Sequence, residues 1–127
     1  MDNREFVRIR HRLGKTQNQL AQLLCVSPKA VQSFEQGWRR VPTEAERQLL
    51  FLLACKMSAG AERSPCWQIK KCPAPRRDRC PAWEFRSGDY CWFVSGTFCG
   101  GSVRESWVQK MRLCRRCRIY RSMVPAA

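Results

Sequence analysis

The stretch LLCVSPKAVQSFEQG, residues 23–37, breaks one apolar helical pattern and starts another three residues later. Ser27 is a suitable N-cap for the second pattern, and Pro28 would follow it at the first helical position, where its missing N–H costs no hydrogen bond. Gly37 can end the second helix in a left-handed conformation. The sequence therefore predicts two short helices joined by a tight turn, which is a helix-turn-helix.

The residues on either side predict further helices. One covers 4–13 and ends at Gly14, a second begins after Thr16, and a fourth follows Pro42 over about 43–56. The expected core consists of Phe6, Ile9, Leu13, Leu20, Ala21, Leu23, Leu24, Val31 and Phe34. We therefore expect a mainly α chain with an N-terminal domain of four to five helices over residues 1–57.

The segment KTQNQLAQLLCVSPKAVQSFEQGWRRVP, residues 15–42, resembles the XRE-type, phage repressor-like DNA-binding domain. The matching features are Thr16-Gln17, Leu20-Ala21, Val26-Ser27, Val31, Glu35 and Gly37. The resemblance covers about residues 4–56 and implies a partner of double-stranded DNA, bound by a homodimer. Where that family usually has glycine this chain has Cys25, so we expect a positive φ there, which costs about 1 kcal/mol.

The charge of the chain agrees with a polyanionic partner. The 127 residues carry a net charge of +14, which favours nucleic acid. Residues 1–65 hold 11 basic and 6 acidic side chains, a net charge of +5, whereas residues 66–127 hold 13 and 4, a net charge of +9. The excess is larger in the second half of the chain.

The start of the second helix of the pair is the expected base-reading surface. Ser27 and Pro28 open this helix, and Lys29, Gln32 and Ser33 are placed to reach base edges in the major groove. Gln32 suits adenine, and Lys29 suits guanine or a phosphate. The polar side chains of this segment are therefore the candidate sequence-reading residues.

Other residues are expected to hold the DNA backbone. Gln17, at the positive N-terminal end of the preceding helix, is the candidate phosphate contact. Arg39 and Arg40, just past the base-reading helix, are expected to bind the backbone or the minor groove. Trp38 is expected to pack against the protein.

The second half is rich in cysteine. Its seven cysteines are Cys66, Cys72, Cys80, Cys91, Cys99, Cys114 and Cys117. We expect a linker at 58–65, a Cys-rich domain at 66–121 and a tail at 122–127. The sequence shows no membrane span and no signal peptide, so we expect a cytoplasmic, reducing location, where clustered cysteines more often bind metal than form disulfides.

The expected metal site is made of thiolates. Cys114 and Cys117 have the two-residue gap that lets two thiolates hold one metal, and the sole histidine, His11, lies in the other half. Such ligands suit zinc or a [4Fe–4S] cluster, and the sequence leaves this choice and the four ligands open.

We expect residues 90–98 to form a strand or hairpin and residues 102–117 to hold a short helix.

The pattern CWQIKKC…CPAW…CWFVSGTFCGG…KMRLCRRCRIY is similar to a CW-type cysteine-rich module that is appended to bacterial regulatory proteins. This resemblance covers about residues 66–120.

The chain is therefore expected to be a two-domain transcriptional regulator whose Cys-rich domain binds metal and reports redox state or metal supply. The alternatives are a static zinc-stapled dimerisation domain and an antitoxin-type autoregulator. An enzyme is not expected, because no carboxylate–His or Cys–His pair is evident.

Overall fold

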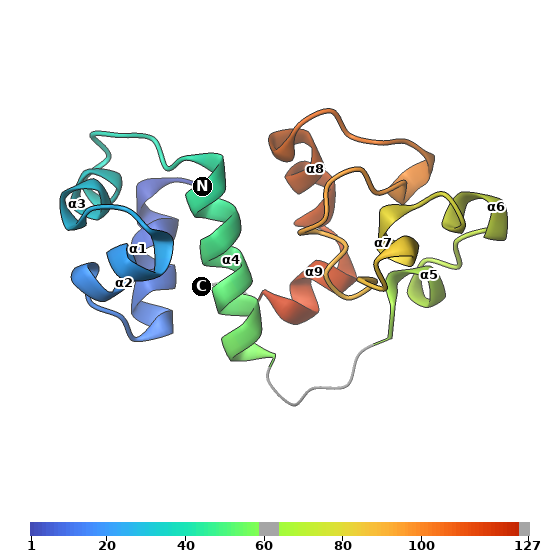
Figure 1. The fold of residues 1–127 in the computed structure, drawn as a ribbon, viewed down its shortest axis with the longest axis horizontal. Coiled ribbons are helices and arrows are strands. Elements are labelled where there is room, and N and C mark those ends of the chain that lie inside the picture. Colours follow the sequence, from blue (N-terminus) through green and yellow to red (C-terminus); the bar gives the residue numbers. More distant parts are fainter. Residues whose placement is uncertain (59–63, 125–127) are drawn as a thin grey trace. The chain divides into compact units, whose positions relative to one another are not determined.

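The structure is a computed structural model that describes residues 1–58 and 64–124. It divides into two units, Met1–Met57 and a second that begins at Ser58. All regular elements in the described ranges are helices, which confirms a mainly α chain (Figure 1). Most of the linker expected at 58–65, and the end of the tail expected at 122–127, lie outside the described residues. Among those that are described, no helix is long and apolar enough to cross a membrane.

The first unit places its helices close to the expected boundaries. They are α1 (Asn3–Leu13), α2 (Gln17–Leu24), α3 (Pro28–Gln36) and α4 (Thr43–Met57). Helix α3 packs against α1 and α2, and α4 packs against the same two helices. The four helices form one compact unit (Figure 1).

Local side chains set the ends of these helices. Thr16 and Gln19 form a reciprocal capping box at the start of α2, and the Ser27 hydroxyl accepts a hydrogen bond of 3.0 Å from the amide of Ala30. Gly14 and Gly37 end α1 and α3 with φ of 69° and 77°. The caps expected at Thr16, Ser27 and both glycines are therefore confirmed.

The core of the first unit forms where the apolar faces of the four helices meet. Phe6 of α1 and Phe34 of α3 are fully buried and meet edge to face, with 5.7 Å between ring centroids. All the expected core residues are buried except Leu23, which is 44% exposed. Leu23 lies well away from the centre of the stripe formed by Leu20 and Leu24, so its expected burial was wrong.

The second unit is built from short helices. They are α5 (Cys66–Ile69), α6 (Ala74–Arg77), α7 (Pro81–Glu84), η1 (Cys99–Gly101), α8 (Trp107–Cys114) and α9 (Arg118–Met123). The helix expected within 102–117 is α8, which confirms that prediction. The strand or hairpin expected at 90–98 was wrong, because these residues form turns around the fully buried Trp92.

A close backbone approach joins two segments of this unit. The amide of Cys66 donates a hydrogen bond of 2.9 Å to the carbonyl of Gly88. A Cβ at position 88 would lie 2.7 Å from side-chain atoms of both Pro65 and Trp67. Only glycine fits there without displacing its neighbours, so Gly88 fixes the position of the first cysteine of the unit.

Candidate functional site

The turn between α2 and α3 has the geometry of a helix-turn-helix. Cys25 adopts a left-handed conformation with φ of 54° and ψ of 43°, and the amide of Val26 donates a hydrogen bond of 3.0 Å to Ala21. The positive φ expected at Cys25 is thus confirmed, and it redirects the chain into Ser27 and α3.

Replacing Cys25 with glycine is expected to raise the free energy of unfolding of the first unit by up to about 1 kcal/mol, because glycine adopts positive φ without steric cost. Cys55→Gly is a matched control, since Cys55 is also exposed but lies inside α4. There the same change should lower stability by about 0.5–1 kcal/mol. Hydrogen exchange of amides in α1–α3 measures both effects. Destabilisation by Cys25→Gly would contradict the expectation.

Helix α3 presents polar side chains to solvent at its N-terminal half. Lys29 and Gln32 are exposed, whereas Ser33 is half-buried and its hydroxyl donates a hydrogen bond of 3.0 Å to the carbonyl of Lys29. Pro28 is exposed at the first helical position. The side-chain oxygen of Ser27 is occupied by its capping hydrogen bond from the amide of Ala30. Of the expected base-reading residues, Lys29 and Gln32 therefore have the most accessible side chains.

A buried carboxylate holds α3 against α1 and α2. Glu35 accepts hydrogen bonds from the Nε of Arg10 and the side-chain amide of Gln17, and its side chain is 7% exposed. The side chain of Asn3 also donates a hydrogen bond of 3.2 Å to the Glu35 carbonyl. This polar link, which we call the Glu35 clamp, joins three helices and fixes the direction of α3.

The sequence indicated Glu35 only as part of the family resemblance and did not predict its contacts with Arg10 and Gln17. The signal was present, because Glu35 is the single charged acidic side chain in α3 and follows the buried Phe34 directly. Gln17, the expected phosphate contact, is half-buried because of this bond. An amide nitrogen carries two hydrogens, so one remains for a second acceptor.

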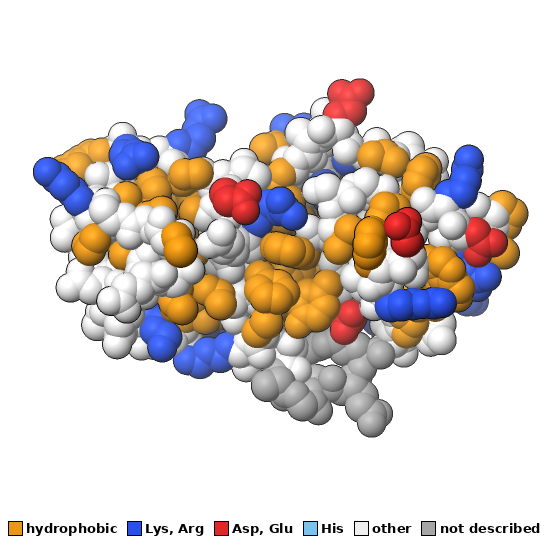
Figure 2. Space-filling model, in the orientation of Figure 1, with side chains coloured by type: hydrophobic (Ala, Val, Ile, Leu, Met, Phe, Trp, Pro, Cys, Tyr) orange, Lys and Arg blue, Asp and Glu red, His pale blue; other side chains and the backbone are white. Residues whose placement is uncertain are grey.

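The segment after α3 is exposed and basic. Arg39 and Arg40 are exposed, and the guanidinium of Arg39 lies 5.3 Å from the ring centroid of Phe34. Trp38 is 78% exposed, so the packing role expected for it was wrong. On the face drawn in Figure 2, Lys and Arg side chains are spread over both units and do not form one stripe. On this face, therefore, charge alone does not single out one nucleic-acid-binding surface.

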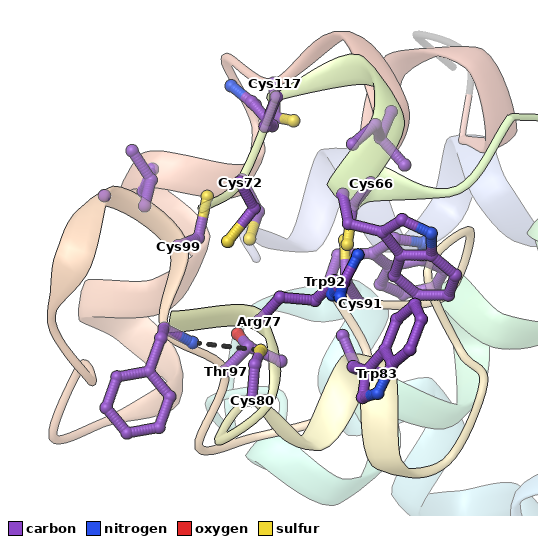
Figure 3. Close-up of a pocket in the computed structure, with 18 of the residues that line it drawn as sticks. Cys66, Cys72, Arg77, Cys80, Trp83, Cys91, Trp92, Thr97, Cys99 and Cys117 are labelled. Atoms are coloured by element: carbon purple, nitrogen blue, oxygen red, sulfur yellow. Dashed lines mark hydrogen bonds between the residues drawn. The ribbon is translucent and has the colours of Figure 1, made fainter. Parts of the chain in front are cut away.

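The second unit contains a cavity that gathers all of its cysteines. Cys66, Cys72, Cys80, Cys91, Cys99, Cys114 and Cys117 line one space of about 270 Å³ (Figure 3). Cys25 and Cys55 belong to the first unit and are exposed. We call this space the thiol cavity. The structure thus brings together every expected metal-ligand candidate, although they come from segments up to 51 positions apart.

The thiols of the cavity differ in their ionisation. Cys91 and Cys66 share a side-chain hydrogen bond, which lowers the pKa of Cys66 and, together with burial, raises that of Cys91. Burial raises the pKa of Cys99, and it raises the pKa of Cys114 to about 11. Cys66 is therefore the thiol among these four that ionises most readily.

One hydrogen bond to a cysteine, and the closely spaced pair Cys114 and Cys117, also belong to the cavity. The amide of Phe98 donates to the Sγ of Cys80 at 3.3 Å (Figure 3). Cys114 ends α8 and Cys117 precedes α9, and both are buried. Nevertheless, in the ranges that the structure describes, no three His, Cys, Asp or Glu side chains are grouped to hold a single metal ion.

Basic side chains complete the lining of the thiol cavity. Lys70, Arg76, Arg77 and Lys110 line it, and the described lining contains no Asp, Glu or His. Lys110 is only 6% exposed, and its Nζ donates a hydrogen bond of 2.6 Å to the hydroxyl of Thr97. A buried ammonium among thiols favours negative charge in this space. Sequence reasoning missed Lys110, because an isolated lysine in a helix is ordinarily exposed.

Comparisons with known proteins agree with the geometry of the first unit. Residues 7–46 match the family model described as helix-turn-helix, which covers α2, α3 and most of α1. The comparisons with curated proteins and with solved structures gave no match. The CW-type resemblance of the second unit thus stays a prediction. The helix-turn-helix match over residues 7–46 supports an XRE-like regulator that binds double-stranded DNA.

Proposed function

We propose that this protein is a cytoplasmic transcriptional regulator that binds an operator sequence-specifically as a homodimer and has no catalytic role. The observation that carries the proposal is the exposure of Lys29 and Gln32 on an α3 that the Glu35 clamp fixes in place. One such helix reads only a few base pairs, so two copies on half-sites about 34–36 Å apart would supply the remaining specificity.

The roles of the individual residues follow from their positions. Gln32 pairs with an adenine edge, and Lys29 binds guanine or a phosphate. Ser33 contacts only a base edge that lies close to α3, because its short side chain donates its hydroxyl hydrogen to the carbonyl of Lys29 in the same helix. Ser27 and Pro28 set the start of α3 beside the groove.

Contacts to the DNA backbone come from the flanks of the helix pair. Gln17 opens α2 and offers its second amide hydrogen to a phosphate. Arg39 and Arg40 bind the backbone or the adjacent minor groove, where their exposed guanidinium groups meet phosphates. These contacts position the protein and carry little sequence information.

The second unit is proposed to bind a metal centre, either zinc or an iron–sulfur cluster, through four of its seven cysteines. The support is the convergence of all seven thiols on one cavity. Gain or loss of the metal would change how the two DNA-binding units of a dimer are held, and so whether both half-sites are reached. The unit would thereby report redox state or metal supply to the operator.

Removing the metal is expected to change operator affinity by about 5- to 150-fold, the usual range for coupling between two sites. Anaerobic fluorescence anisotropy with metal-loaded and metal-stripped protein measures this. A scrambled duplex serves as the control, because loss of folding would alter binding to both. Equal affinities would reject the sensing role and favour a purely structural metal.

A further inference from the structure

The thiol cavity is larger than a single metal ion requires. On the same measure, a cavity of about 10–15 Å³ already holds one water molecule, whereas the thiol cavity measures about 270 Å³. Tetrahedral zinc binds its sulfurs at about 2.3 Å, so the sulfurs of any two ligands lie about 3.8 Å apart. The size of this space suits an occupant of several atoms.

The arrangement of the thiols leads to the same conclusion. No three of the candidate ligands in the described ranges are grouped around one ion position, although seven cysteines line the same cavity. In a [4Fe–4S] cluster each cysteine binds a different iron, so the ligands are spread around a core of eight atoms. Dispersed thiols around a large cavity fit such a core better than they fit one zinc ion.

The charge of the lining fits an anionic occupant. A cluster with four thiolate ligands carries net negative charge, and Lys70, Arg76, Arg77 and Lys110 supply four cations. Lys110 is buried and has three donor hydrogens, of which Thr97 accepts one. The other two hydrogens can donate to cluster sulfurs.

We propose that the thiol cavity holds a [4Fe–4S] cluster, bound by four of the seven cysteines, with Lys110 donating hydrogen bonds to its sulfurs. This rests on the proposed metal-binding function of the second unit and narrows it to one kind of centre. Lys110 acts here as a positioning and charge-balancing residue, and the cysteines are the ligands.

The first test is the composition of the full chain, purified without oxygen and reconstituted with equal amounts of ferrous and ferric iron and with sulfide. Four iron and four acid-labile sulfide per chain, with visible absorption that bleaches on one-electron reduction by dithionite, are expected. Zinc without sulfide, a two-iron centre or metal-free protein would each overturn the proposal. Cys25→Ala and Cys55→Ala serve as controls and should keep the full iron content, because these cysteines lie outside the cavity.

The second test addresses Lys110. Lys110→Met removes the buried positive charge and should make the midpoint potential of the cluster more negative, because the added electron loses a nearby cation. Arg112→Met is the matched control on the same helix, since Arg112 is exposed and does not line the cavity. Equal potentials in both variants would overturn the placement of the cluster against Lys110. If Lys110→Met does not fold, the composition of the unmodified chain still decides the proposal.

The two proposals fail in distinguishable ways. Operator binding depends on α3 in the first unit, and cluster composition is read from iron, sulfide and absorption alone. A zinc-loaded protein that binds its operator would overturn the cluster and leave the DNA-binding function intact. A protein with four iron and four sulfide that does not distinguish operator from scrambled duplex would do the reverse.

Discussion

Arg10→Met is expected to lower the free energy of unfolding of the first unit by about 3–5 kcal/mol, the usual loss when one partner of a buried ion pair is removed. The Glu35 carboxylate would keep its bond from Gln17 but would lose Arg10, the one opposite charge that pairs with it in the described part of the chain. The cost of a buried, unpaired charge is large because water cannot replace the missing partner. Stability should therefore fall although Arg10 is not part of the apolar core.

Arg12→Met provides the control, because Arg12 lies on the same helix and is exposed. Its replacement should change stability by no more than about 0.5 kcal/mol. Hydrogen exchange of amides in α1–α3 of the full chain reports the opening of the first unit separately from the second. Equal losses in the two variants would show that the Glu35 clamp contributes nothing particular.

Replacing Lys29 and Gln32 together with alanine is expected to remove about 2–6 kcal/mol of discrimination between operator and scrambled duplex, since each good base contact contributes about 1–3 kcal/mol. Both side chains are exposed, so the fold of the first unit should be unchanged. The operator for this experiment is obtained by selection from random duplexes with the unmodified protein, and anisotropy then gives the two dissociation constants.

The matched control is Lys15→Ala with Gln22→Ala, which removes the same two kinds of side chain from exposed positions outside α3. Loss of a phosphate-binding lysine weakens binding to all sequences about equally and lowers the salt dependence, whereas loss of base contacts lowers discrimination. If the Lys29 and Gln32 variant discriminates as well as the control does, α3 is not the sequence-reading element.

The helices of the first unit could be predicted because their ends depend on neighbouring residues. Thr16, Ser27 and Gly37 act within one turn of their own helix, and the apolar stripes repeat at a regular interval. Leu23 was misplaced because a short helix allows more than one centre for its stripe. The left-handed Cys25 was predicted from the resemblance to a family that uses glycine there.

The second unit was predicted less well because its order depends on contacts between distant segments. Residues 90–98 contain the aromatic and β-branched side chains that favour strands, but Trp92 packs edge to face against Tyr120, far along the chain. The sequence identified all seven cysteines as candidate ligands and did not predict that Lys110 would line the same cavity. The burial of Lys110 and the packing of Trp92 on Tyr120 follow from tertiary contacts and leave no local pattern.

The last turn of α4 is joined to the first helix by one further bond. The ammonium of Lys56 donates a hydrogen bond of 2.7 Å to the carbonyl of Leu13, at the C-terminal end of α1. Arg10, one turn earlier on α1, holds Glu35 of α3. The end of α4 is therefore linked to α3 by two polar contacts that both pass through α1, Lys56 with Leu13 and Arg10 with Glu35, so a displacement of the chain at Met57 reaches α3 without crossing a loop.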